Sequence, residues 1–222
     1  AAYFAYLAFL DAQIGRLVER LQRSGLLDNT LIVFTSDHGE MLGDHHLWRK
    51  TYAYEASARV PLIAVAPESI NAKRNVECDG LVGWEDIMPT FLQAAATDQP
   101  ESVEGHSILG LLNDPSDILR PFYHGEHAPC YHPENANQFL TDARWKYIWN
   151  PINGEEQLFD LRADPHECAD LAQKEPEVLS HWRKTMARQL VGRQEQLSDG
   201  TQLRTGDVQA CRFAQADELH LG

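Results

Sequence analysis

The chain of 222 residues lacks any long apolar run. No stretch approaches the roughly 20 consecutive apolar residues that a membrane-spanning helix needs. Basic residues are also scarce, because 19 lysines and arginines face 33 aspartates and glutamates and leave a formal net charge of −14. Such a balance argues against a nucleic-acid backbone as the main partner. With 43% apolar residues the chain can still bury a core, so general disorder is excluded.

Cysteines are few and widely spaced, at Cys78, Cys130, Cys168 and Cys211. They form no C-x-x-C pair, and their density is far below that of small disulfide-rich domains. Neither a zinc ribbon nor a disulfide scaffold is therefore indicated, and the redox compartment stays open.

The first residues contain no initiator Met, no basic segment and no cleavage-site pattern. An amphipathic repeat begins at once and runs through Leu7, Leu10, Ile14, Leu17 and Leu21. This spacing predicts a helix already under way, which should end near Gly25. We therefore expect the sequence to begin inside a larger protein, so that the localisation stays unknown.

Apolar runs and helical patterns alternate in the first half of the chain. Residues 31–34 and 61–67 are short apolar runs typical of buried strands, and residues 85–96 have helical spacing with Pro89 near the first turn. A short helical piece is expected around 107–112. The pattern predicts an α/β fold with a mainly parallel sheet.

The composition shifts to Pro, Asp, Ser and Gly between residues 99 and 121, which predicts a boundary between domains 1–117 and 118–222. Beyond it, runs 138–141, 145–149 and 157–160 are separated by turn-forming residues and predict an antiparallel sheet. A helix from about 175 presents Leu179, Trp182 and Met186 on one face and can cover that sheet. The second domain is thus a small α+β unit with an extended tail from 198, and its tryptophans fit a packed core.

Two metal-binding side chains directly follow the first predicted strand, Asp37 and His38. Ligands of open α/β sheets bind where strands end. A neighbouring Asp and His can turn one oxygen and one nitrogen toward a single cation if the backbone bends, and Gly39 permits that bend. In the alternative interpretation Asp37 caps a turn and His38 is a hydrogen-bonded core residue.

The motifs that follow favour the metal interpretation. After Ser36-Asp37-His38-Gly39 come Gly43-Asp44-His45-His46, then Lys50 thirteen positions after Asp37, and then Tyr54-Glu55. This order resembles the sulfatases of the alkaline phosphatase superfamily, and within them arylsulfatases and choline-sulfatase-like enzymes. The resemblance continues through 86–90, 105–109, 144–148, 156–161 and 164–167, and extends from about residue 1 to 200.

The resemblance assigns roles to matching residues. It implies an alkaline-phosphatase-like sandwich in which Asp37 and His38 bind a divalent metal, and Lys50 is catalytic because its charge stabilises the leaving group. His45 would bind substrate. Calcium is implied by the resemblance, whereas donor chemistry alone would equally allow Mn2+, Mg2+ or Zn2+.

The run His124-Gly125-Glu126-His127 is a second cluster of polar side chains. A second metal site is the less favoured interpretation. We expect the segment to leave a strand edge near the pocket mouth, where His124 and His127 bind the organic part of the substrate. Cys130 lacks a neighbouring base and is not expected to be a nucleophile.

Two elements of the sulfatase active site are absent from the sequence. No cysteine or serine begins a Cys/Ser-x-Pro/Ala-x-Arg motif, from which the family makes its formylglycine nucleophile, and no Asp-Asp pair occurs. The resemblance thus implies that the formylglycine lies upstream, and that this fragment alone is inactive. The expected substrate of the full-length protein is a small-molecule or saccharide sulfate ester, without nucleic acid or a membrane segment, and an oligomer is possible.

Two alternatives stay open. Residues 43–47 also resemble phosphonate monoester hydrolases, so the substrate could be a phosphonate monoester or a phosphodiester. A non-catalytic module derived from the fold would retain Asp37, His38 and Lys50 only as remnants.

Overall fold

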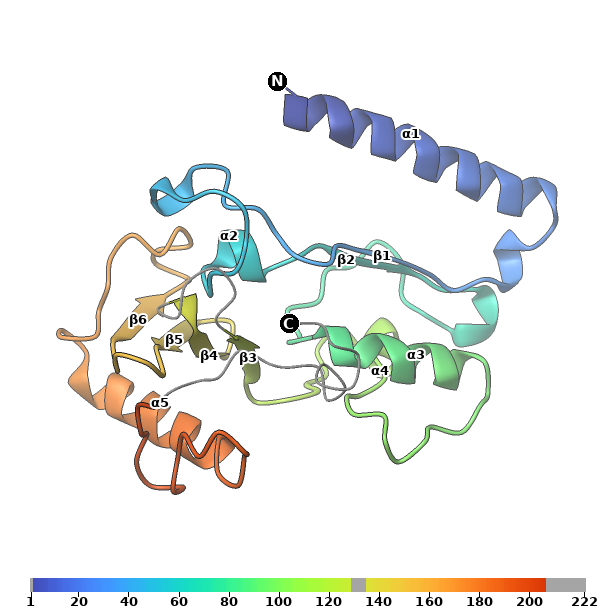
Figure 1. The fold of residues 1–222 in the computed structure, drawn as a ribbon. Helices are drawn as coiled ribbons and strands as arrows, with labels where there is room; N and C mark the ends of the chain where they lie inside the picture. The colour runs from blue at the N-terminus through green and yellow to red at the C-terminus, as the bar shows by residue number, and fades with distance from the viewer. Residues whose placement is uncertain (1, 129–134, 207–222) are drawn as a thin grey trace, which may run out of the picture. The chain divides into compact units, whose positions relative to one another are not determined.

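The computed structural model describes residues 2–128 and 135–206, which form two compact units (Figure 1). The first unit contains the described residues up to Thr35 together with Leu62–Leu119. The second contains Ser36–Pro61 and the described residues from Arg120 onward. The predicted division at residue 117 would place Ser36–Pro61 in the first part, whereas in the structure this run packs within the second unit.

The first unit contains the helices and strands that periodicity predicts. Helix α1 ends before Gly25, whose positive φ of 66° suits the left-handed position after a helix. The main elements of this unit are α1 (Ala2–Arg23), β1 (Ile32–Thr35), β2 (Leu62–Val65), α3 (Ile87–Ala94) and α4 (Leu109–Asn113). Single 3-10 turns occur at Leu27–Asn29, Glu68–Ile70 and Trp84–Asp86. Among the described residues, no helix is long and apolar enough to span a membrane.

Strands β1 and β2 pair with each other in antiparallel orientation, with Thr35 opposite Leu62. We expected a mainly parallel sheet, and this pair departs from that orientation. The chain leaves β1 at Thr35 and returns at Leu62 to the same end of the ladder. Within the intervening segment, Gly39 N donates a hydrogen bond to Ser57 O (2.8 Å). An apolar run does not reveal its direction, so the sequence could not predict this pairing.

The hydrophobic core of the first unit is small. Within the described residues, its buried apolar side chains are Ala66, Pro67, Pro89, Ile108 and Leu111. The strands are not buried as expected, since Ile63 and Val65 remain 57% and 47% exposed. This unit by itself therefore leaves apolar surface on its sheet uncovered.

Polar contacts hold α3 to the turn before α4. The Asp86 carboxylate accepts hydrogen bonds from Gly83 N (2.7 Å) and His106 N (2.8 Å), and Thr90 Oγ1 accepts one from Ile108 N (3.0 Å). Both acceptors are fully buried. Residues 86–90 and 105–109, which we singled out by resemblance, thus join two helices of the first unit.

The second unit is built on a four-stranded antiparallel sheet in the order β3-β4-β5-β6. Its strands are β3 (Tyr123–His127), β4 (Asn137–Thr141), β5 (Trp145–Trp149) and β6 (Glu156–Asp160), and its helices are α2 (Glu55–Ala58) and α5 (Pro176–Gln189). The antiparallel sheet and the covering helix are confirmed. Sequence analysis placed the 124–127 segment at a strand edge, and the structure makes it the edge strand β3 itself.

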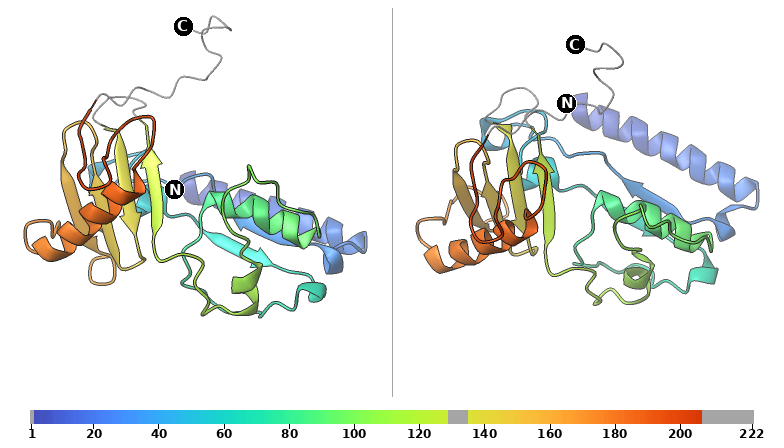
Figure 2. Two further views of the ribbon diagram at one scale, coloured as in Figure 1. Left: turned by 90° about the horizontal axis from the view of Figure 1, so that it is seen from below. Right: turned by 60° about the horizontal axis from the view of Figure 1, so that its bottom comes forward.

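The two faces of this sheet bury different partners. Leu140, Tyr147, Trp149 and Leu158 pack against α5, which lies across one face (Figure 2). On the opposite face, Ala53 packs with Ile148 and Phe159. The predicted core role of the tryptophans is confirmed, because Trp149 and Trp182 are buried between sheet and helix, with Trp145 against them. The segment that carries Lys50 is therefore attached to the sheet face that α5 does not cover.

Candidate functional site

Asp37 and His38 form a tight turn at the start of the loop Ser36–Pro61. Ser36 Oγ donates to His38 O (2.7 Å), and His38 N donates to Asp37 Oδ1 (3.0 Å). The Asp37 side chain is 81% exposed and the His38 ring 37% exposed. The turn therefore presents a carboxylate and an imidazole at the surface of the second unit.

The His38 ring is oriented so that one nitrogen faces the carboxylate. Its Nδ1 lies 2.7 Å from Gly39 O, and a carbonyl can only accept, so Nδ1 carries the proton. Nε2 then has a free lone pair and lies 3.6 Å from Asp37 Oδ2. Two ligands that each lie about 2.4 Å from one ion at a right angle are separated by roughly 3.4 Å. The pair thus fits joint ligation of a divalent cation, with the backbone carbonyl fixing the ring.

This pair supplies only part of a metal shell. Within residues 2–128 and 135–206, no group of three or more His, Cys, Asp or Glu side chains is arranged to hold a metal ion. Further ligands would have to come from backbone, water or residues beyond those described.

Gly39 brings the turn against helix α2. A Cβ on Gly39 would overlap Ala56 O and would lie 3.1 Å from Ser57 O. Only glycine permits this approach, which allows the Gly39 N to Ser57 O hydrogen bond. The Asp37–His38 turn and α2 are therefore held together by direct backbone contact.

The loop between these elements closes on itself and is conformationally strained. Met41 N donates to Arg49 O (2.8 Å), and Gly43 N donates to Leu47 O (2.9 Å). Glu40 Oε1 accepts from Arg49 N (2.5 Å). Positive φ angles occur at the non-glycine residues Leu42, His45, His46, Arg49 and Thr51. Such a concentration of left-handed residues is typical of functional loops.

Lys50 directly follows the closed loop and is partly buried. Its backbone is fixed on both sides, because Arg49 pairs with Met41 and Thr51 O accepts from Asn137 Nδ2 of β4 (3.0 Å). Its ammonium makes no hydrogen bond or ion pair with any residue that the structure describes. The charge that we predicted to be catalytic is thus available to a ligand.

His45 is held by two contacts within the second unit. Its ring stacks on Tyr54 with centroids 4.0 Å apart and planes at 7°, and Nε2 lies 3.0 Å from His166 O. Nε2 must donate to that carbonyl, which leaves Nδ1 as an acceptor. The predicted role of His45 in substrate binding would therefore use Nδ1.

His124 and His127 lie on opposite faces of β3, because side chains three positions apart on a strand alternate. His124 Nε2 lies 2.7 Å from Gln138 Oε1, and burial lowers the pKa of His124. Burial also lowers the pKa of His127. The two rings cannot bind one ion or one ligand together, so their predicted substrate contacts would have to be separate.

Glu126 shares the His124 face of the strand and is paired rather than free. Arg193 contacts its carboxylate at 2.8 Å, and Gln138 Nε2 donates to it. Burial by itself would raise the pKa of Glu126, but the hydrogen bonds from Arg193 and Gln138 outweigh burial and hold the pKa below its usual range. This carboxylate therefore stabilises the fold around β3.

No role was predicted for Lys146 and Glu167, although they lie in segments 144–148 and 164–167, which resemble the sulfatases. The Lys146 side chain is 0% exposed and Glu167 is 2% exposed, and their charged groups lie 3.2 Å apart. The available signal was a lysine between the aromatic residues Trp145 and Tyr147 in a predicted strand.

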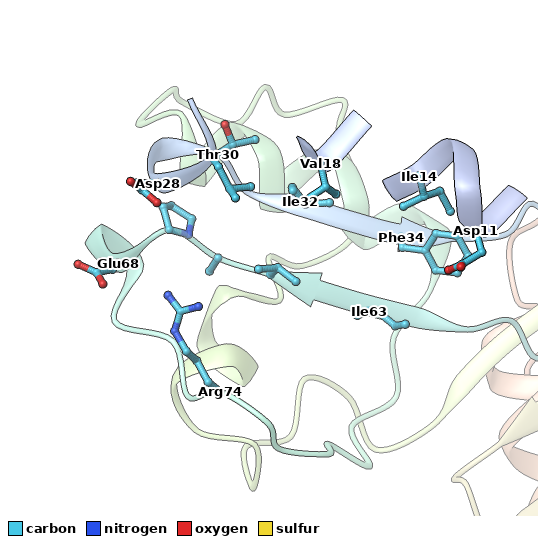
Figure 3. A pocket seen from close by; sticks show the side chains of 14 residues that line it. Asp11, Ile14, Val18, Asp28, Thr30, Ile32, Phe34, Ile63, Glu68 and Arg74 are labelled. Carbon is cyan, nitrogen blue, oxygen red and sulfur yellow. The ribbon is translucent and has the colours of Figure 1, made fainter. Parts of the chain in front are cut away.

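A separate cavity of about 620 Å³ lies in the first unit. Its apolar wall includes Ile14 and Val18 of α1 and Ile32 and Phe34 of β1, and Asp28, Glu68 and Arg74 add charge (Figure 3). None of the predicted site residues lines it.

Comparison with known proteins identifies relatives for most of the chain. The family model described as Sulfatase matches residues 1–97. An arylsulfatase of Clostridium perfringens (strain 13 / Type A) is 38% identical over 209 residues, which cover 93% of this chain and 43% of that protein. A choline-sulfatase of Rhizobium meliloti (strain 1021) is 36% identical over 177 residues, which cover 78% of this chain and 33% of that protein.

Solved structures share the fold. BT4656 in complex with its substrate D-glucosamine-2-N,6-O-disulfate is similar with a TM-score of 0.72 and 30% identity, over 83% of this chain and 39% of that one. A phosphonate monoester hydrolase from Silicibacter pomeroyi is similar with a TM-score of 0.69 and 28% identity, over 89% of this chain and 42% of that one. The chain spans less than half the length of the curated relatives it matches. Over the region that it shares with them, the chain belongs to the sulfatase family.

Proposed function

We propose that these 222 residues form the C-terminal portion of a metal-dependent sulfuric ester hydrolase. The observation that carries the proposal is the convergence of Asp37 Oδ2 and His38 Nε2 at 3.6 Å on a turn whose imidazole is fixed by Gly39 O. The formylglycine nucleophile of the family has no source among these residues, because the motif is absent. Its source is proposed to lie upstream.

Asp37 and His38 are the proposed ligands of a divalent cation. The bound cation would draw electron density from the sulfate oxygens and so favour attack at sulfur. A carboxylate oxygen suits Ca2+, whereas the imidazole nitrogen suits Mn2+ or Zn2+ better. We propose calcium on the family resemblance, with the other ions as the comparison in binding experiments.

Lys50 is the proposed catalytic cation for the leaving group. An ammonium near the bridging oxygen stabilises the negative charge that develops there as the ester bond breaks. An alkoxide carries more of that charge than a phenolate, so an alkyl sulfate depends on Lys50 more strongly than an aryl sulfate. His45 Nδ1 would accept a hydrogen bond from the bound ester.

The proposed substrate class is a small-molecule or saccharide sulfate ester. One similar structure holds a sulfated glucosamine that is named as its substrate. A phosphonate monoester hydrolase activity is the second candidate, because two solved hydrolases of that type match with TM-scores of 0.69 and identities of 28% and 27%. Sulfate monoesters and phosphonate monoesters are both tetrahedral monoanions at neutral pH, and they differ in the central atom and in the group attached directly to it.

The experiment compares two proteins, the 222-residue chain and the product of the complete reading frame that encodes it. Both are assayed with 4-nitrophenyl sulfate and with a phenylphosphonate monoester, with Ca2+ or Mn2+. We expect sulfate hydrolysis by the complete product, and none by the 222 residues. Preference for the phosphonate would favour the second candidate, and robust turnover by the 222 residues would contradict the fragment interpretation.

Variants of the complete product test the assigned roles. Lys50→Ala should lower kcat more for an alkyl sulfate than for an aryl sulfate, whereas Lys184→Ala, which changes an exposed lysine on α5, should leave both unchanged. Equal losses for the two esters would contradict the leaving-group role of Lys50.

A further inference from the structure

A fully buried lysine lies beneath the loop that carries the predicted site. Lys146 of β5 has a side chain that is 0% exposed. Its Nζ donates to Ala53 O (2.8 Å) and to the Glu55 carboxylate, and lies 3.2 Å from Glu167 Oε1. A buried ammonium is tolerated only where such partners surround it. The ion cluster is defined here as Lys146, Glu55 and Glu167.

Glu167 completes the cluster from a turn near the end of the sheet. Its Oε2 accepts from Glu55 N (2.6 Å), which is the first residue of α2. Burial raises the pKa of Glu167, and the neighbouring Lys146 acts in the opposite direction. Glu167 also has a positive φ of 54°, so the turn is strained to bring this carboxylate inward. Lys146 and Glu167 therefore hold residues 53–55 by hydrogen bonds to the Ala53 carbonyl, the Glu55 carboxylate and the Glu55 amide.

From residues 53–55, direct contacts lead to His45 and to Gly39, which follows the Asp37–His38 turn. Tyr54 stacks on His45. Helix α2 begins at Glu55, and its Ser57 O accepts from Gly39 N, next to the metal-binding pair. Lys50 lies on the same strand of chain, three residues before Ala53. The cluster is thus connected to His45 and to the Asp37–His38 turn through the contacts of Tyr54 and α2, and to Lys50 through the backbone between residues 50 and 53.

We propose that the ion cluster is a positioning site, which sets the geometry of the Asp37–His38 turn and of Lys50. The chemical roles of Asp37, His38 and Lys50 rest on the proposed function, whereas the placement of their loop by the ion cluster does not. A purely structural role is the competing explanation. Buried ion pairs contribute little to stability beyond what apolar side chains of similar size provide, but they fix one arrangement of the groups they join. Apolar replacement should therefore preserve the fold and release the loop.

The main test is amide hydrogen exchange by NMR on the 222-residue chain. The variant Lys146→Met/Glu167→Leu removes one positive and one negative charge, so that no unpaired lysine remains buried. We expect the Gly39 and Met41 amides to exchange at least about tenfold faster, the effect of losing one charge-assisted hydrogen bond. The Leu140 and Tyr147 amides of the sheet should keep their protection. The matched control Lys184→Met should change neither set.

Two results would overturn the proposal. One is unchanged protection of Gly39 and Met41 in the double variant. The other is an equal loss of protection at Leu140 and Tyr147, which would assign the cluster a structural role only. If the double variant fails to fold, Glu167→Gln decides instead, because it keeps the size of the side chain and an acceptor for Glu55 N. Its Gly39 amide should exchange faster than in the parent chain, and an unchanged rate would overturn the proposal.

A metal readout separates this inference from the proposed function. Mn2+ broadening of amides near His38 should weaken in the cluster variant through loss of geometry. If Asp37→Asn leaves that broadening unchanged in the parent chain, the metal assignment fails while the exchange result still stands. If Asp37→Asn abolishes broadening and the cluster variant retains it in full, the positioning role fails.

Discussion

Gly39→Ala should selectively disrupt the junction between the Asp37–His38 turn and helix α2. The new methyl group would overlap Ala56 O and would lie 3.0 Å from its carbonyl carbon. The Gly39 backbone is not in the left-handed region, so the penalty arises from the steric overlap alone. Overpacking of this kind costs about 1–3 kcal/mol, and the hydrogen bond to Ser57 O adds about 1 kcal/mol if it breaks.

The assay is urea unfolding of the 222-residue chain followed by tryptophan fluorescence, because Trp149 and Trp182 lie in the core of the second unit. We expect the free energy of unfolding of this unit to fall by about 2–4 kcal/mol. Gly15→Ala is the matched control, since a Cβ there meets nothing within 4 Å and alanine favours the interior of α1. A urea midpoint of Gly39→Ala equal to that of the parent chain would show that the methyl group does not overlap Ala56 O as expected.

Three further predictions concern stability. Burial lowers the pKa of His124 below its value in the unfolded chain, so the unfolded state binds the proton more readily. The free energy of unfolding should therefore be highest above about pH 6.5 and decline toward pH 5. In urea titrations, His124→Gln should flatten this pH dependence. A pH profile that is identical in the variant would count against this. Gly125→Ala should destabilise the second unit by about 1–3 kcal/mol, because its methyl would overlap the Phe139 ring, and wild-type stability would show that β3 sits differently. In hydrogen exchange, amides of β1 and β2 should exchange faster than those of β4 and β5, since the first unit buries so little apolar surface; equal rates would contradict this.

The local spacing of apolar residues was sufficient to predict most of the helices and strands. The apolar spacing of α1 and α5 and the strand runs of β4 to β6 all have the predicted structure. Strand β3 was not predicted as a strand because Gly125 and Glu126 have low strand propensity, and its pairing with β4 supplies the stability. The antiparallel direction of β2 relative to β1 was not predicted, since an apolar run carries no information about the direction of its partner strand.

The candidate site was predictable only where its residues are neighbours in sequence. Adjacency places Asp37 and His38 together, and the structure adds the ring orientation. The separation of His124 and His127 follows from strand alternation, which applies only once β3 is known to be a strand. The ion cluster could not be predicted, because Lys146 and Glu167 contact Glu55 from 91 and 112 positions away. Such contacts depend on how the sheet and the loop pack.

The most direct test of the account is a titration of the 15N-labelled chain with Mn2+, which broadens the amide signals of residues close to the bound ion. We expect broadening of residues 36–41 and of Lys50, and its loss in Asp37→Asn/His38→Gln. Asp44→Asn/His46→Gln, an exposed acid and imidazole on the same loop, should leave the broadening in place. Broadening centred elsewhere, or retained in full by the first double variant, would contradict the claim that Asp37 and His38 share a cation near Lys50.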